Sequence, residues 1–278
     1  MTKDLQPLIP INPEGLDNLT RELLNETPTQ AFTPVSNIDN PRSYLILPEK
    51  THGDYSYPDL NVEITRLGYD NEVENAAENL KLTLKNTQKE NNGKEFIGNI
   101  NWEQALKLNL TLNSFALSPR QFLDFIALLK SGKAFYADGT PADKKLMDNI
   151  LDEILTVRSP YRGEWLDADF KVKNNKLYIN YAHKLINGNL NPQRSELLEE
   201  YLAADKQIDL DNLLINSTKH GLPKKNVKEG SLNYWAPDND NNSVAGFDAC
   251  SGRFGLVCGR YPQGSSEGLG VRRAKNRR

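Results

Sequence analysis

The pattern of apolar and polar residues predicts its clearest helix from Pro119 to about residue 131. Ser118 and Gln121 form a capping box, and Pro119 occupies the first helical position. The apolar residues that follow fall on one face at i, i+3, i+4 and i+7: Phe122, Phe125, Ile126 and Leu129. Gly132 stands where a left-handed C-terminal cap is needed. This segment is therefore predicted to pack one face against the core.

Further helices are predicted on both sides of this one. Asn101 can cap a helix that begins at Trp102, with Gln104 returning the hydrogen bond. Residues 142–157 form a helix with a buried apolar stripe made of Leu146, Met147, Ile150, Leu151, Ile154 and Leu155. A surface helix and loop are expected over residues 69–98, and a short helix over residues 194–203.

Strands are predicted where the period of the apolar residues changes to two. The segment SYLILPEKTHGDYSYPDLNVEI contains two strand-like runs separated by a His-Gly-Asp turn. After Trp165, apolar and polar residues alternate on both sides of Asn174-Asn175, a pair that tolerates positive φ, so a hairpin is expected there. The chain between residue 203 and the C-terminal segment, with Gly221, Pro223 and Gly230, is expected to be irregular. Helices and separate antiparallel strands together indicate an α+β fold.

Composition and charge limit the possible functions. The chain has 278 residues, 38% of them hydrophobic, and a net charge of -3, so no global field draws it to nucleic acid or to anionic lipid. No run is long enough to insert in a membrane and no export signal is visible, which predicts a soluble protein. Its location is left open: cytoplasmic by default, or displayed on a surface through a partner. Residues 1–41 are expected to form an extension with a short helix whose face carries Leu16, Leu19, Leu23 and Leu24. The terminal VRRAKNRR is expected to be a solvated tail, with a contact to nucleic acid as the less favoured alternative.

The C-terminal segment alternates in an unusual way. Phe247, Ala249 and Ser251 form one set, and the residues between them are chemically miscellaneous: Gly246, Asp248, Cys250 and Gly252. After Arg253-Phe254 the parity inverts, and Leu256 and Cys258 become the inward set. Because alternate strand residues face opposite sides, two strands joined by a bend near Phe254 are expected. An ordinary glycine-rich strand pair with one wet face would also fit this pattern.

Several motifs together resemble the variable proteins of diversity-generating retroelements, particularly the archaeal type. The segments that carry the resemblance are SYLILPEKTHGDYSYPDL ending at Leu60, FLDFIALLKSG at 122–132, RGEWLDADF at 162–170, and YWAPDNDNNSVAGFDACSGRFGLVCGRYPQ continuing to LGVRRAK. The resemblance implies a C-type lectin fold, related to formylglycine-generating enzymes, over residues 42–278. It implies a variable region at about 233–278, rewritten by an error-prone reverse transcriptase that randomises adenines.

The resemblance also implies which residues vary. Asparagine codons are the usual randomised ones, and with the third base kept they never yield Trp, Met, Lys, Glu or Gln. The miscellaneous set is reachable from such codons and forms the expected ligand-binding set: Asp248, Cys250, Gly252, Phe254, Gly255, Val257, Gly259, Tyr261, Gly264, Ser266 and Gly268. Glu267 is not reachable, and Gly246 stands where the family pattern leads us to expect arginine. The expected scaffold residues are Trp235, Phe247, Ala249, Leu256, Cys258, Leu269, Gly270 and Val271.

The implied function is that of a non-catalytic receptor without cofactor or metal, whose ligand is a protein or a cell-surface molecule. An adhesin within a larger assembly would share the same face. A rival is an oxidase like the enzyme relatives of the fold, with copper held by Cys250 and Cys258. A carboxylate cluster at Glu164, Asp167 and Asp169 lacks a neighbouring histidine in the sequence, so a structural role is favoured for it.

Calcium-dependent sugar binding is a further alternative. Asp238, Asp240 and Asn242 have the D-x-D-x-N spacing of calcium loops. Ser243 replaces the usual glycine, however, and Ala249 occupies the place of the bidentate glutamate. A polar loop before the variable strands is therefore the favoured interpretation.

Overall fold

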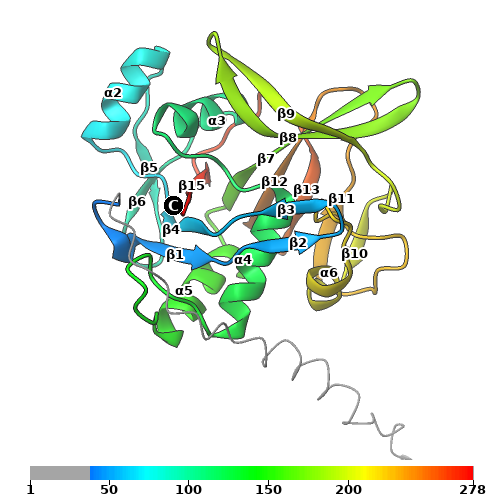
Figure 1. Ribbon diagram of the computed structural model, residues 1–278, viewed down its shortest axis with the longest axis horizontal. Helices are drawn as coiled ribbons and strands as arrows, with labels where there is room; N and C mark the ends of the chain where they lie inside the picture. Colours follow the sequence, from blue (N-terminus) through cyan, green and yellow to red (C-terminus); the bar gives the residue numbers. More distant parts are fainter. Residues whose placement is uncertain (1–37, 278) are drawn as a thin grey trace, which may run out of the picture. The chain divides into compact units, whose positions relative to one another are not determined.

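A computed structural model describes residues 38–277 of the chain (Figure 1). It confirms an α+β architecture with several antiparallel sheets and a group of helices. The helix predicted over Leu16–Leu24 lies outside the described residues. None of the helices between residues 38 and 277 combines the length and the apolar character that crossing a bilayer requires.

The largest sheet carries the C-terminal hairpin. Its strands follow the order β10-β11-β13-β12-β7-β8-β9, and β14 pairs with β7. Their bounds are β7 Arg162–Lys173, β8 Lys176–Ile186, β9 Asn189–Leu197, β10 Lys206–Ile208, β11 Leu232–Trp235, β12 Ser243–Cys250, β13 Arg253–Arg260 and β14 Leu269–Gly270. The predicted hairpin at Asn174-Asn175 is confirmed, because both residues adopt positive φ between β7 and β8.

A smaller sheet joins the beginning of the described chain to its end. Its order is β1-β4-β15, with β1 Tyr44–Leu47, β4 Leu60–Arg66 and β15 Arg272–Asn276. Between β1 and β4, the predicted turn at Gly53 is confirmed by its φ of 67° and connects β2 Lys50–His52 to β3 Tyr55–Tyr57. Residues 69–98 contain a hairpin of β5 Asn86–Lys89 and β6 Glu95–Ile97 in addition to the expected surface helix.

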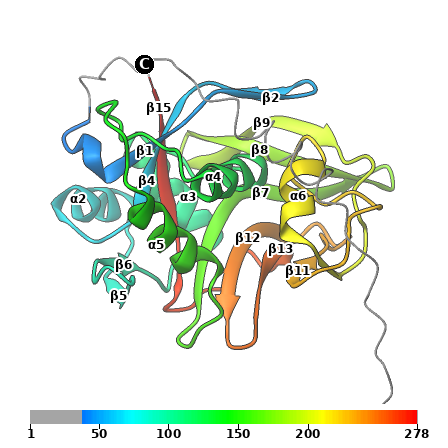
Figure 2. The same cartoon turned by 90° about the horizontal axis from the view of Figure 1, so that it is seen from below.

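The capped helices agree with their sequence signals. Helix α3 (Trp102–Thr111) has the capping box of Asn101 and Gln104, and α4 (Pro119–Ser131) has that of Ser118 with Gln121. Gly132 ends α4 in the left-handed conformation, with a φ of 67°. The predicted apolar stripe belongs to α5 (Lys144–Leu155), which, with α4, lies beside β7 and β12 (Figure 2). Helix α2 (Asn71–Leu80) and a single 3-10 turn at Pro41–Ser43 complete this part of the fold.

Two predictions between residues 194 and 230 are wrong. The expected helix at 194–203 is the end of β9 followed by a loop, because pairing with the distant strand β8 overrides local helix propensity. The following chain, expected to be irregular, contains α6 (Leu210–Asn216) and the short strand β10. Asp209 caps α6 by accepting a hydrogen bond from the Asn212 N–H.

The core lies on both faces of the large sheet. The main cluster includes Phe122 of α4 and Phe247 of β12, whose ring centroids are 5.3 Å apart. A second cluster surrounds Trp165, whose indole N–H donates to the Ile100 carbonyl at 2.8 Å. Because β12 has buried neighbours on both sides, nearly all of its residues are inaccessible to solvent.

The terminal basic run is not a solvated tail, which corrects the sequence-based expectation. Arg272 is 2% exposed and forms a bidentate ion pair with Glu164 of β7, at 2.7 and 3.0 Å. It also donates to the carbonyls of Glu63 and Ile64 in β4. Arg273 pairs with Glu63 at 2.7 Å. Successive residues of β15 face opposite sides of the small sheet. Arg272 therefore reaches Glu164 of the large sheet, whereas Arg273 pairs with Glu63 of the neighbouring strand β4.

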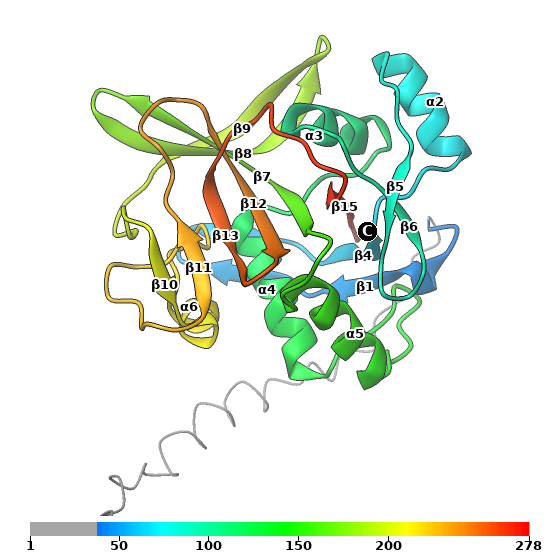
Figure 3. The same cartoon turned by 180° about the vertical axis from the view of Figure 1, so that it is seen from behind.

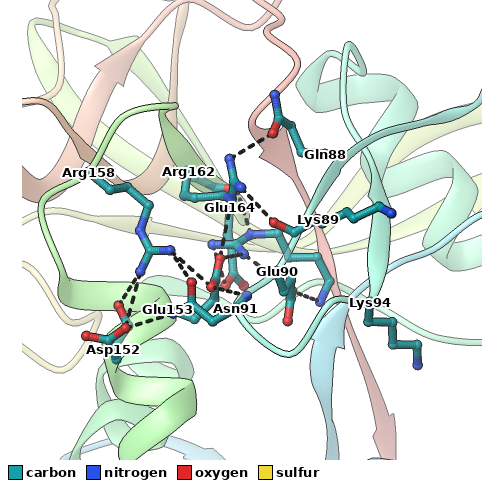
Figure 4. Close-up of polar contacts among 12 residues, drawn as sticks. Gln88, Lys89, Glu90, Asn91, Lys94, Asp152, Glu153, Arg158, Arg162 and Glu164 are labelled. Carbon is teal, nitrogen blue, oxygen red and sulfur yellow. Dashed lines mark hydrogen bonds and ion pairs between the residues drawn. The ribbon is translucent and has the colours of Figure 1, made fainter.

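A buried ionic network continues from this pair. Arg66 lies 3.1 Å from Glu153, 3.3 Å from Glu90 and 3.6 Å from Glu164. Figure 4 shows two further arginines directed at Glu153, namely Arg158 from the loop after α5 and Arg162 from the start of β7. Burial raises the pKa of Glu90 despite the nearby Arg66, whereas the pKa of Glu164 is lowered because its two arginine partners outweigh the effect of burial. These groups hold helix α5, both sheets and the C-terminal strand in one register.

We predict that Arg272→Met lowers the free energy of unfolding by about 3–5 kcal/mol, because it removes the bidentate ion-pair partner of the buried Glu164 carboxylate. Lys275→Met in the same strand, where the side chain is partly exposed, is the matched control and is expected to have an effect within about 0.5 kcal/mol. Urea denaturation measures both. Equal effects of the two substitutions would show that the pair has no special role.

Candidate functional site

The C-terminal hairpin has the two-faced pattern that the sequence indicated. In β12 and β13, Asp248 lies opposite Gly255, Gly246 opposite Val257, and Phe247 opposite Leu256. Cross-strand partners share a face of the sheet, so the inversion of parity between the two strands is confirmed. The reversal itself occurs two residues earlier than expected, at Ser251 and Gly252, where Gly252 has a φ of 90°.

The inner face of the hairpin belongs to the main core. Phe247, Leu256 and Cys258 are at most 2% exposed and pack in the same cluster as α4. The other expected scaffold residues are buried as well, namely Ala249, Leu269, Gly270 and Val271. Trp235 is the exception, because its side chain is partly exposed on the other face.

The other side of the hairpin, here called the outer face, consists of Trp235, Asp248, Cys250, Arg253, Val257 and Arg260. Figure 3 shows the strands that carry it, β11, β13 and β12, side by side. The guanidinium of Arg253 lies 4.9 Å from the centre of the Trp235 ring. That of Arg260 lies 5.8 Å from the Tyr161 ring and 5.5 Å from the Trp165 ring. The outer face is thus an aromatic surface covered by two arginines.

Asp248 is not an exposed binding residue, contrary to expectation. It is 6% exposed, because Arg260 forms an ion pair with its carboxylate and the Tyr161 hydroxyl donates to it at 3.4 Å. Burial raises the pKa of the Asp248 carboxyl, while Arg260 acts in the opposite direction. The sequence placed Asp248 on the correct face but could not show that neighbours cover it.

Three glycines of the expected variable set have no room for a side chain, which corrects their assignment. A Cβ on Gly255 would overlap the Asn233 carbonyl, and one on Gly268 would overlap the Tyr161 carbonyl. A Cβ on Gly259 would lie 2.8 Å from the Ala236 carbonyl oxygen. The residues that a codon can produce say nothing about the room for a side chain at that position. The sequence therefore could not reveal that another stretch of backbone passes so close to these glycines.

The remaining expected variable positions are at least partly accessible. Tyr261 is 57% exposed, and Cys250 and Val257 are partly exposed on the outer face. Phe254 is partly buried but lies on the inner side, opposite Ala249, where it packs against the main core. The other members lie in turns or loops: Gly252, Gly264 and Ser266. These positions are therefore spread along the whole hairpin, from Cys250 and Gly252 at its turn to Tyr261 and the loop beyond its opposite end.

The two cysteines do not share a site. Cys250 is on the outer face beside the turn, whereas Cys258 is fully buried on the inner face. Cys250 pairs with Arg253, so Cys258 is five residues along β13, about 16 Å away at the usual rise of a strand. Burial also raises the pKa of the Cys258 thiol, which opposes formation of a thiolate. This geometry does not fit one copper ion held by both sulfurs.

The loop with calcium-like spacing uses its polar groups within the protein. Asp240 accepts a hydrogen bond from the Asn242 N–H at 2.9 Å, and the Asn241 side chain accepts from Val172 of β7. Between residues 38 and 277, no group of three or more acidic, histidine or cysteine side chains is arranged to hold a metal ion. The side chains of this loop therefore hold the turn against β7.

The carboxylate cluster does have a histidine beside it, which corrects the sequence interpretation. The Nδ1 of His183 is 2.5 Å from Asp167, and its Nε2 is 3.3 Å from Asp169. Burial opposes the imidazolium charge, but hydrogen bonds to the two carboxylates outweigh it and raise the pKa of His183 to about 9. Glu164, the third carboxylate, belongs instead to the Arg272 network. His183 comes from β8, and only the antiparallel pairing with β7 brings it near.

Comparison of the chain with protein-family models, with curated proteins and with solved structures finds no match.

We predict that the hairpin separates into tolerant and intolerant positions. The triple variant Cys250→Ser, Val257→Ser, Tyr261→Ser changes the unfolding free energy by about 1 kcal/mol or less, because these side chains are at least partly exposed. Gly255→Ala alone costs about 1–3 kcal/mol through overpacking, and Leu256→Ala about 2–5 kcal/mol through a cavity. Thermal and urea denaturation measure all three. If the triple variant were the least stable, the division into two faces would be wrong.

Proposed function

We propose that this protein is a non-catalytic ligand-binding receptor with a C-type lectin fold, of the kind diversified by retroelements. The observation that carries the proposal is the difference between the buried inner face of the hairpin and the partly exposed positions outside it. Its inner face supplies core side chains such as Phe247 and Leu256, while Cys250, Val257 and Tyr261 contribute little to that core. Substitution of the second group leaves the packed framework intact.

The chemistry of the surface also supports binding. Trp235, Arg253 and Tyr261 belong to the residue types that dominate the energetics of protein interfaces. Tyr261 is exposed, and Trp235 is covered by a flexible arginine that a ligand can displace. The rigid strands beneath restrict the loss of conformational entropy on binding. The proposed ligand is a protein or another macromolecule on a cell surface.

A competing oxidase function has weaker support. It requires both cysteines at one metal, and their positions on opposite faces of the hairpin oppose this. A sugar-binding lectin function would require calcium at the Asp238–Asn242 loop, whose Asp240 side chain already accepts a backbone hydrogen bond. Both functions are therefore less well supported than that of a receptor.

The proposal predicts that the surface accepts new binding specificities. A display library randomised at Cys250, Ser251, Arg253, Val257 and Tyr261 is expected to remain folded in most members, because none of these residues is fully buried. Selection against immobilised lysozyme, as a model protein, is expected to enrich binders that lose binding when the five positions are reverted. Display level measures folding, and titration with soluble lysozyme measures binding.

The matched control is a library randomised at Gly255, Gly259 and Gly268, which is expected to lose folded display because side chains there overlap backbone. Retention of display in this control, or a folded first library without any binder whose affinity depends on the randomised residues, would contradict the proposal.

A further inference from the structure

A separate cavity of about 340 Å³ lies away from the hairpin. Its walls come from the β2–β3 hairpin, the end of α3, the start of α4, and the facing strands β8 and β9. None of its lining residues belongs to β12 or β13. Its volume is at the lower end of the range for small-molecule sites. The receptor face described above therefore does not account for this cavity.

The acidic groups of the cavity already have partners. Asp167 accepts from both the ring and the backbone N–H of His183. Glu196 accepts from the Tyr181 hydroxyl at 2.5 Å and forms an ion pair with Lys219 at 2.7 Å. Lys219 also lies 2.7 Å from Asp54, so the acceptor groups of these carboxylates are occupied within the protein.

Several side-chain hydrogen-bond donors that line the cavity are available to a ligand. Within residues 38–277, neither Lys184 of β8 nor Arg194 of β9 forms an ion pair, and both line the cavity. Arg194 lies opposite Tyr181 in the strand ladder, so its side chain shares the face that contains the cavity. Gln121 uses its carbonyl oxygen to cap α4, which leaves its amide N–H groups for another acceptor. The unused hydrogen-bonding capacity thus consists mainly of donors.

The backbone beside these donors is strained. Ala182 has a φ of 54°, a left-handed conformation that an L-residue with a Cβ rarely adopts. The ladder between β7 and β8 ends at Asn180, and beyond it the Asp167 carboxylate binds the His183 N–H. Such strain accumulates at binding sites, where the surrounding contacts maintain it.

We propose that this cavity binds a small organic anion about the size of one sugar ring, such as an acidic monosaccharide. Arg194 and Lys184 hold its negative group, and the amide of Gln121 donates to a ring oxygen or hydroxyl. Phe115 and Leu110 supply an apolar wall for the ring. This site is independent of the outer face and of its diversification.

Isothermal titration of the full chain with glucuronate, glucose 6-phosphate and neutral glucose tests the proposal. We expect at least one of the two anions to bind at millimolar concentration or below, and glucose to bind more weakly. Arg194→Gln is expected to weaken anion binding roughly tenfold or more, as the loss of a charged hydrogen bond requires. Lys176→Gln, an exposed cation at the other end of β8, is the matched control and should leave binding unchanged.

A variant changed at Cys250, Val257 and Tyr261 should bind the same anion as the original chain, which separates the cavity from the outer face. Whichever of glucuronate and glucose 6-phosphate binds shows whether the site prefers a carboxylate or a phosphate. Absence of binding by both anions, equal binding of glucose, or equal losses in the Arg194→Gln and Lys176→Gln variants would overturn the proposal. Circular dichroism of each variant shows that the fold is retained.

Discussion

The buried ion pair between Arg272 and Glu164 is the constraint on which the arrangement of the C-terminal chain depends. It joins the last strand, in the small sheet, to β7 in the large sheet, and β7 is the strand on which β12 is aligned. Charges this deeply buried are tolerated when paired and hydrogen-bonded, and Arg272 also donates to two carbonyls of β4. The pair thus sets the register of the framework beneath the outer face.

Under the proposed function, this framework is what would allow the outer face to vary without loss of the fold. The stability of the hairpin comes from its inner face and from flanking strands, whereas the outer face contributes cation–π contacts and partly exposed side chains. The proposed variable surface is smaller than the sequence indicates, however. Asp248 is covered by Arg260, and backbone approach fixes the glycines at 255, 259 and 268. The cavity lined by β8, β9, the β2–β3 hairpin and the ends of α3 and α4 is a second, chemically different surface.

Features encoded locally could be predicted from the sequence. The capping boxes at Asn101 and Ser118, the cap at Gly132 and the turn at Asn174-Asn175 depend on neighbouring residues. Features that depend on distant chain could not be predicted. The residues around Glu196 form a strand because they pair with β8. Arg272 is buried because it forms an ion pair with Glu164, and His183 lies beside Asp167 because β8 pairs with β7. The close approach of Asn233 to Gly255 is of the same kind.

The DNA that flanks the gene offers the most direct test of the central claim, that a fixed framework presents a surface diversified by a retroelement. Sequencing it is expected to reveal a reverse transcriptase gene and a near-copy of the final coding segment. The two copies should differ at adenines, in codons such as those of Cys250, Val257 and Tyr261. Absence of the second copy, or differences concentrated in the codons of buried residues such as Phe247 and Leu256, would contradict the account.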